Sequence, residues 1–401
     1  MKQILVYVSL FCIGLMLSCT NAIEFENRVY IAGTEESDTR QLIVDGVPSE
    51  VAFMATLTDL VDEVIEVEIA ADNGLIEAYN RKNHKNYKPM PGGSFNLSAS
   101  VLRIEPQNLR SNPAKVVITD DSAFEEGTSY LMPVTITKVK GGVKLLDASK
   151  TVYFTILKTI VTKACNLRGS LYFRVDFSKN GDESLTALPA ATMETRFYCT
   201  ATMSGNPWIS SIMGLEENWL IRMGDARNIP DNSVQTAGSG SNATAPNPTP
   251  LGEWHHLAAV FENKTVKLYI DGNLEAQTPH PGSSSFDGKP KSTPGCINLM
   301  AMYGDPSFSI GISANATARR WNGYFSEMRV WKKALTRADI VNNMCYVDPA
   351  SPGLVAYWRF DGSTTEEDGK TVILDHTGNG YNAVPSATIA ANNWVENVKC
   401  P

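Results

Sequence analysis

Aromatic residues near predicted loops are the first candidates for binding chemistry in this chain. An accessible indole or phenol ring can stack on the apolar face of a sugar while neighbouring polar side chains hydrogen-bond to its hydroxyl groups. Five residues fit this description: Trp208, Trp219, Tyr303, Trp321 and Tyr381. Trp208 is the first choice because it follows the loop-like Gly205-Asn206-Pro207. Core or rim packing is the alternative for each ring, and it is the expectation for Trp254, Trp331 and Trp358, which lie in strand-like motifs.

Acidic and amide side chains at predicted turns are the candidate metal ligands. Calcium takes several oxygen ligands from carboxylates, amides and carbonyls. The candidates are Asp225, Asp271, Asp305, Asp375 and Asn379. Asp375 and Asn379 form the predicted calcium site because both lie in one glycine-rich loop. The alternative for all of them is turn formation, in which Asp or Asn bonds its own backbone, and we expect this for Asp271.

Histidines and nucleophiles give weaker signals. His255 and His256 are adjacent in a strand-like run, so their side chains point to opposite faces and do not chelate one ion together. Cross-strand packing or hydrogen bonding is expected for both. The chain has no G-x-S-x-G, no H-E-x-x-H and no phosphate-binding loop. No residue is therefore predicted to be catalytic.

The N-terminus has the pattern of an export signal. Lys2 precedes an apolar run from Ile4 to Leu17, and the small residue Ser18 stands before Cys19. The run is shorter than the ~20 apolar residues of a membrane-spanning helix. The sequence before Cys19 resembles a bacterial lipobox, which implies a signal peptide over residues 1–18 and lipid attachment at Cys19. We expect a lipoprotein of the outer membrane at the cell surface, with the periplasmic face as the alternative.

Composition indicates an ordinary globular protein. At ~150 residues per domain, 401 residues predict two or three domains. The formal net charge of −8 argues against nucleic acid, which favours a basic surface. Five cysteines follow Cys19, an odd number, so one or two disulfides with a leftover buried thiol are expected after export. They are Cys165, Cys199, Cys296, Cys345 and Cys400.

Alternation of apolar and polar residues predicts an all-β protein of two domains. Strand-like runs separated by turn signals include Val64–Ile69, Lys115–Thr119, Leu131–Thr137 and Val152–Leu157. A change in pattern across 160–168 places the domain boundary, so the predicted domains are residues 19–160 and 161–401. The most loop-like segments, Asp225–Leu251 and Thr278–Gly295, both lie in the second domain.

The second domain contains the strongest local signals. Two hairpins are predicted, in which Trp254–Phe261 and Val266–Ile270 are strands, Glu262-Asn263-Lys264 is the first turn and Asp271-Gly272-Asn273 the second. Gly323–Trp331 reads as a further strand. After it, Thr336 is expected to cap a short helix, with Asp339 completing a capping box.

The first domain is similar to a known family. Its motif order is Tyr79-Asn80, then Tyr87-x-x-x-Pro91, then Gly127-x-x-Tyr130-x-x-Pro133-Val134. This order is similar to that of domain of unknown function 1735, an immunoglobulin-like sandwich near the lipid anchor of surface lipoproteins in glycan-foraging gram-negative bacteria. The resemblance implies a spacer domain without catalytic residues.

The second domain closely resembles the laminin-G-like (LamG, concanavalin A-like) family. The motifs are W-H-H-x-A-x-x-F from Trp254, L-Y-I-D-G from Leu268, G-x-x-x-E-x-R-V-W-x-x-A-L from Gly323, and the runs Leu354–Gly362 and Asp375–Gly380. The resemblance spans roughly Leu167 to Pro401. It implies a jelly-roll of two antiparallel sheets that binds glycans or proteins, often with calcium.

Three functions remain open at this point. The preferred one is non-catalytic binding of a polysaccharide or host glycan within a glycan-uptake system. A glycoside hydrolase is the first alternative; laminarinase-like members use E-x-D-x-x-E, but here Thr371 replaces the last carboxylate after Glu366-x-Asp368, and the segment reads as a turn. A hydrolase site needs two carboxylates in one cleft. The second alternative, a protein-binding adhesin, predicts a flat apolar patch.

Overall fold

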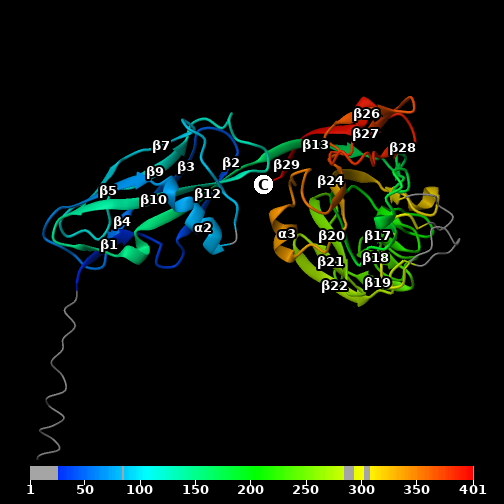
Figure 1. The fold of residues 1–401 in the computed structure, drawn as a ribbon, viewed down its shortest axis with the longest axis horizontal. Coiled ribbons are helices and arrows are strands. Elements are labelled where there is room, and N and C mark those ends of the chain that lie inside the picture. Colours follow the sequence, from blue (N-terminus) through cyan, green and yellow to red (C-terminus); the bar gives the residue numbers. More distant parts are fainter. Residues whose placement is uncertain (1–25, 84, 284–292, 302–307, 401) are drawn as a thin grey trace, which may run out of the picture. The chain divides into compact units, whose positions relative to one another are not determined.

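The computed structural model describes residues 26–83, 85–283, 293–301 and 308–400. The chain divides into two compact units, Met1–Lys158 and Thr159–Pro401 (Figure 1). This division lies next to the boundary expected from the sequence. Cys19, Tyr303 and Asp305 lie outside the described residues. Within the described ranges, no helix is long and apolar enough to cross a membrane.

Unit 1 is an immunoglobulin-like β-sandwich, and its described residues include one short helix, α2 (Ile76–Asn83). Residues from all three of its sheets meet in one core, among them Val29, Phe53, Val67 and Phe154. The largest sheet has the order β2 (Thr39–Val44), β12 (Thr151–Lys158), β10 (Ser129–Lys140), β5 (Ile65–Ala71) and β8 (Val101–Ile104), with β6 (Lys88–Pro89) on β10. The smaller sheets are β11 (Lys144–Leu145), β1 (Arg28–Ile31) and β4 (Ala55–Leu57), and β3 (Ser49–Phe53), β9 (Ala114–Ile118) and β7 (Phe95–Leu97).

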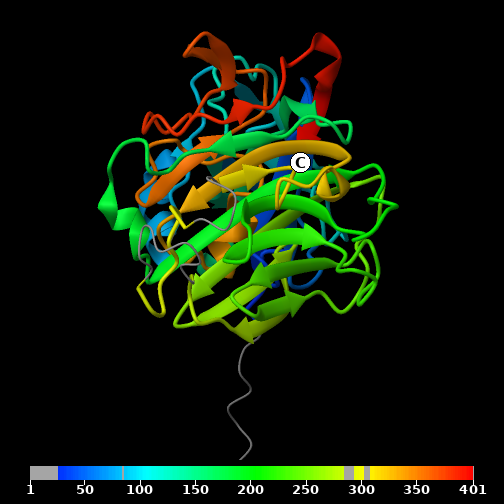
Figure 2. The same cartoon turned by 90° about the vertical axis from the view of Figure 1, so that its right-hand side faces the viewer.

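Unit 2 is a jelly-roll sandwich of two large sheets, which confirms the predicted all-β class. The β15 sheet has the order β22 (Asn273–Pro279), β21 (Thr265–Ile270), β20 (Trp254–Glu262), β15 (Ala190–Cys199), β24 (Gly323–Trp331), β13 (Ile160–Asn166) and β29 (Trp394–Cys400), with β25 (Leu354–Trp358) on β24. The β17 sheet has the order β19 (Ser241–Thr244), β18 (Val234–Gly238), β17 (Trp219–Met223), β16 (Ser210–Leu215), β23 (Phe308–Ile310), β14 (Phe173–Val175) and β28 (Val384–Pro385). Figure 2 shows these strands running side by side.

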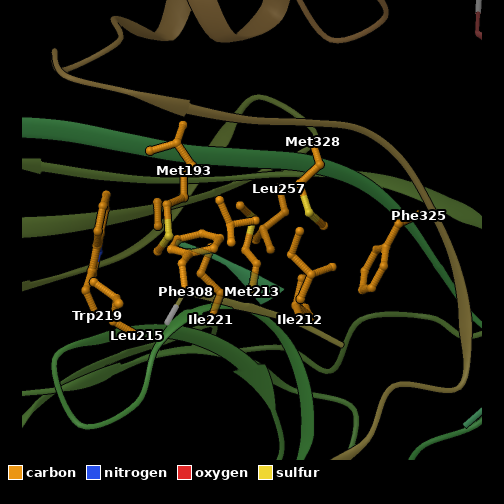
Figure 3. Close-up of a cluster of buried hydrophobic side chains, with 14 of the residues drawn as sticks. Met193, Ile212, Met213, Leu215, Trp219, Ile221, Leu257, Phe308, Phe325 and Met328 are labelled. Atoms are coloured by element: carbon orange, nitrogen blue, oxygen red, sulfur yellow. The ribbon is translucent and has the colours of Figure 1, made fainter. Parts of the chain in front are cut away.

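The core of unit 2 lies between these two sheets. In Figure 3, Met193, Leu257 and Met328 of the β15 sheet meet Met213 and Phe308 of the β17 sheet. Each such buried side chain contributes about 1.5–3 kcal/mol of hydrophobic free energy. Because side chains alternate along a strand, the residues between these core positions point away from the core. The outer face of each sheet is therefore where a binding site can form.

The two predicted hairpins are confirmed. The β20–β21 turn has φ of 50° at Asn263 and 55° at Lys264, and the β21–β22 turn has 49° at Asp271 and 75° at Gly272. Positive φ at both central residues is the type I′ geometry that matches strand twist. Asp271 does more than form its turn: its carboxylate accepts the His256 N–H and lies 2.8 Å from the His255 ring.

The remaining elements of unit 2 are short. Helix α3 (Arg337–Asn342) begins at Thr336, whose hydroxyl and the Asp339 carboxylate form the predicted capping box. A hairpin follows later in the chain, with β26 (Thr364–Glu367) and β27 (Lys370–Ile373) joined at Asp368-Gly369, both of positive φ. Short 3-10 helices occur at Glu183–Thr186, Thr317–Arg319 and Ala391–Asn393 in unit 2, and at Asn73–Leu75 and Asp147–Ser149 in unit 1.

The cysteines of unit 2 form one disulfide, between Cys345 and Cys400. The other three are free thiols, of which Cys165 and Cys199 are buried and Cys296 is half-buried. Burial raises the pKa of both Cys165 and Cys199 to about 12, so neither ionises at neutral pH. The sequence expectation of a disulfide with a buried thiol left over is confirmed.

Candidate functional site

Three of the predicted carbohydrate platforms are core residues, which corrects the sequence analysis. Trp219 and Trp321 are 1% and 0% exposed, and Tyr381 is 4% exposed. Trp219 faces inward on β17, Trp321 stacks on the Phe325 ring at 5.1 Å, and Tyr381 packs against Phe177 at 5.0 Å. Protein atoms cover the faces of these rings, so the rings are not free to stack on a sugar.

Among the predicted platforms that the structure describes, Trp208 remains accessible. Its ring is half-buried, and the guanidinium of Arg227 lies 4.1 Å from the ring centroid. Its φ of 53° is a left-handed conformation that costs a bulky residue of order 1–3 kcal/mol. Gly224 permits this arrangement, because a Cβ at that position would lie 2.1 Å from the Trp208 carbonyl oxygen. The surrounding chain therefore holds this indole in one place.

Next to Trp208, polar side chains form a row across the β17 sheet. Arg222 donates two hydrogen bonds to the Gln235 amide oxygen, at 3.1 and 2.9 Å, and lies 2.7 Å from the Asp225 carboxylate. Gln235 in turn donates to the Thr244 hydroxyl at 2.8 Å. The neighbours of these residues along the strands, such as Ile221, Val234 and Ala243, lie in the core. The row consequently lies on the outer face of the sheet, away from the core.

We call this region the Trp208 surface: Trp208, Arg222, Asp225, Arg227, Gln235 and Thr244. A backbone hydrogen bond joins the two segments on either side of this surface: the N–H of Ala226 donates to the Pro207 carbonyl at 2.8 Å. Sequence reasoning found Trp208 and Asp225, although it assigned Asp225 to calcium. It did not find Arg222, Gln235 or Thr244. Their position on one row depends on how β17, β18 and β19 pair, which no local motif encodes.

A second accessible aromatic group lies on the outer face of the β15 sheet. Tyr198, Trp254 and Tyr324, which we call the aromatic shelf, occupy neighbouring strands and face one another directly in the pairing register. All three are half-buried. The expectation that Trp254 is a core residue was wrong. Alternation provided the signal: Leu257, Ala259 and Phe261 of the same strand face inward, and so Trp254 faces outward.

The predicted calcium ligands have a structural role instead. The Asp375 carboxylate is 2% exposed and accepts backbone N–H groups of Tyr357 and Tyr381, each at 3.0 Å, and both the N–H and the hydroxyl of Thr377. Asn379 donates its amide to the Val355 carbonyl at 2.9 Å. Donor groups thus already surround both carboxylate oxygens, where a cation would need them free. In the described part of the chain, no three His, Cys, Asp or Glu residues could hold a metal ion.

Two buried carboxylates bear on the hydrolase alternative. Glu194 on β15 and Glu327 on β24 are both 0% exposed and share Arg329, at 3.2 and 2.9 Å. Glu194 also accepts the Trp331 indole N–H, and Glu327 accepts the Tyr357 hydroxyl and the Arg359 guanidinium. A buried cluster that includes Leu335 and Ile340, beside and within α3, packs on this side of the sheet. Glu194 and Glu327 therefore do not line a cleft.

The ionisation of Glu194 also argues against a role as the general acid of a hydrolase. Burial opposes its ionisation, but Arg329 and His256 outweigh burial and hold the pKa of Glu194 below 4.5. A general acid of a glycosidase needs a raised pKa. The other carboxylate motif, Glu366-x-Asp368, lies at the β26–β27 hairpin, where Glu366 accepts the Thr371 hydroxyl at 2.7 Å.

Comparison with known families and structures agrees with this architecture. Residues 176–341 match the model of the concanavalin A-like lectin/glucanases superfamily. Residues 25–143 match a second model, described as an N-terminal domain. No curated protein matches the chain.

Among solved structures, one from Bacteroides ovatus, described as a candidate carbohydrate-binding protein, is 24% identical over 93% of this chain and 99% of its own, with a TM-score of 0.60. A two-domain protein of unknown function from Bacteroides fragilis covers 53% of this chain and 80% of its own at 14% identity and a TM-score of 0.30. A heptameric SAP-like pentraxin from Limulus polyphemus covers 45% and 80% at 15% identity and 0.31. Over residues 176–341, unit 2 is thus similar to the concanavalin A-like lectin/glucanases superfamily, in agreement with its sequence motifs.

Proposed function

We propose that unit 2 binds carbohydrate without catalysis and that the Trp208 surface contacts the sugar. The observation behind this proposal is a half-buried indole, held in a left-handed backbone conformation, beside an outward-facing row of hydrogen-bonded side chains. A pyranose offers an apolar face for the ring and hydroxyl groups for Arg222 and Thr244, while the buried Gln235 holds both side chains in place. The lectin-like fold and the Bacteroides ovatus structure support the same assignment by analogy.

The arrangement of the row favours binding because it is already ordered. Gln235 is 2% exposed and is fixed from both sides by Arg222 and Thr244. Side chains that are fixed before binding lose little conformational entropy when a sugar arrives. Backbone strain at Trp208 is of the kind that concentrates at ligand sites.

A glycan array with residues 20–401 tests the proposal, with and without calcium. We expect glycan signals from the wild-type protein and weaker signals from Trp208→Ala. Trp394→Ala is the matched control, because Trp394 is also half-buried but lies on β29 in the other sheet. Absence of any glycan signal in both conditions would overturn the proposal. Signals that require calcium would support the calcium dependence predicted from the family, at residues other than Asp375 and Asn379.

We also propose that the protein is a lipoprotein anchored through Cys19 in the outer membrane, where it serves a glycan-uptake system. The support is the export-signal pattern before Cys19, which is followed along the chain by unit 1 and then by unit 2 with its Trp208 surface. Radiolabelled palmitate should enter the wild-type protein and not Cys19→Ala. Proteinase K treatment of intact cells separates the two orientations: digestion indicates the cell surface, and protection indicates the periplasm.

A further inference from the structure

The aromatic shelf has the shape of a second contact surface. Ring centroids lie 5.8 Å apart for Tyr198 and Trp254, 5.0 Å for Tyr198 and Tyr324, and 6.2 Å for Trp254 and Tyr324. Each ring keeps part of its surface accessible. Tyr198 meets the other two rings edge to face, at interplanar angles of 63° with Trp254 and 79° with Tyr324, and together the three present a wider apolar surface than a single indole. Soluble proteins usually bury such groups unless a ligand uses them.

Backbone geometry brings the shelf residues together. Gly323, with φ of 154°, precedes Tyr324 and lets β24 approach β15 closely: a Cβ there would lie 2.0 Å from the Tyr198 carbonyl oxygen. On the other side, Trp254 pairs with Tyr198 at the start of β20. Any side chain at position 323 would push the strands apart and separate the rings.

A polar row runs beside the shelf on the same face. Arg196 lies two residues before Tyr198, and its register partners are His256 on β20 and Ser326 on β24. The Arg196 guanidinium lies 4.9 Å from the Trp254 ring centroid and donates to the Lys399 carbonyl at 3.1 Å. Across the described residues, Arg196 Nη1 and the Ser326 hydroxyl make no hydrogen bond.

Arg196 is the strongest pointer to a ligand. It is 5% exposed, and burial lowers its pKa to about 10, so a charged guanidinium is held in a poorly solvated place with a donor unused. An unsatisfied buried donor costs about 1–3 kcal/mol, and more when charged. Because Nη1 is itself buried, an oxygen-rich ligand seated on the rings must displace part of its cover, after which it would supply the missing acceptor and recover this free energy.

We propose that the aromatic shelf is a second carbohydrate site, which takes the apolar face of a pyranose on its rings and a hydroxyl or ring oxygen on Arg196. A sugar is the ligand class that combines a flat C–H face with a rim of oxygens. The proposal rests on the proposed function, since both sites bind glycans. The two sites lie on the outer faces of opposite sheets, so one long polysaccharide that reaches both would gain avidity.

Affinity electrophoresis in gels containing starch, yeast mannan or arabinogalactan tests this proposal. The shelf variant carries both Tyr198→Ala and Tyr324→Ala. The combined variant carries these two changes together with Trp208→Ala. Tyr324→Phe serves as the conservative variant, and Tyr87→Ala, at a half-buried tyrosine of unit 1, as the matched control. Thermal unfolding within a few °C of wild type verifies that each variant folds.

We expect the shelf variant alone to weaken retardation by about tenfold in apparent affinity, and the combined variant to abolish it. Tyr324→Phe and Tyr87→Ala should migrate as wild type. If Trp208→Ala weakens binding and the shelf variant does not in either background, the second site is overturned while the proposed function stands. If the shelf variant alone removes binding, the shelf proposal stands and the assignment to Trp208 fails. Absence of retardation in all three gels overturns both.

Discussion

Replacing Arg329 with methionine should destabilise unit 2 severely. Arg329 is the shared cation of Glu194 and Glu327, and all three side chains are 0% exposed. Arg329→Met keeps a similar volume but leaves two carboxylates buried without their common partner. Removing one member of a buried ion pair costs about 3–5 kcal/mol, because an uncompensated charge remains in a low-dielectric site.

The expected loss can be measured on unit 2 alone. All seven tryptophans of the chain lie between residues 208 and 394, so intrinsic fluorescence during urea unfolding reports on unit 2. A loss of about 3–5 kcal/mol corresponds to a fall in Tm of roughly 6–20 °C for a unit of this size. Lys163→Ala is the control, since it breaks the exposed Lys163–Glu396 pair, which is worth about 0–1 kcal/mol.

Two results would refute this reasoning. The first is a loss below about 1 kcal/mol in Arg329→Met, because the buried charges would then be solvated in some other way. The second concerns the triple variant Glu194→Gln/Glu327→Gln/Arg329→Met, which removes all three charges. It should recover part of the lost free energy of unfolding, and a further loss would show that hydrogen bonding, and not charge, dominates the network.

Three other perturbations test the structural roles assigned above. Asp375→Ala should lower the free energy of unfolding by about 1–3 kcal/mol, because it leaves buried N–H groups without an acceptor; an unchanged urea midpoint would contradict this role. Loss of the Cys345–Cys400 disulfide, which closes a separation of 55 residues, should cost about 4 kcal/mol, and Cys345→Ser should unfold at the same urea concentration as the reduced wild type. Burial lowers the pKa of His280 from 6.5, so as the pH falls the unfolded state takes up a proton before the folded state does. The contribution of neutral His280 to the free energy of unfolding is therefore complete above pH 6.5 and is lost as the pH falls below that value. Urea unfolding of His280→Gln between pH 7.5 and 5 should show a flatter pH dependence than wild type, and an identical slope would exclude His280 as the titrating group.

Local signals in the sequence predicted the local structure well. The turns at Asn263-Lys264 and Asp271-Gly272 and the capping box of Thr336 with Asp339 each depend on residues a few positions apart. The all-β class followed from alternation over many strands. These features need no knowledge of which strands pair, and therefore the sequence alone is enough to predict them.

The candidate site was harder to predict because it depends on strand pairing. Trp219 and Trp321 lie near loops in the sequence, yet the pairing of β16 with β17 and the packing against Phe325 place them in the core. Arg222 and Gln235 become candidate site residues only because the pairing of β17 with β18 makes them cross-strand neighbours. Asp375 could be assigned to a turn or to a metal on composition alone, and only its four donor contacts distinguish the two.

The most direct test of the central claim is a calorimetric titration of wild type, Trp208→Ala and Trp394→Ala with the glycan that gives the strongest array signal. We predict that Trp208→Ala binds at least about tenfold more weakly, a loss of ~1.4 kcal/mol, while Trp394→Ala binds as wild type does. Equal affinity of Trp208→Ala and wild type, within about twofold, would contradict the claim that the Trp208 surface is the sugar-binding site.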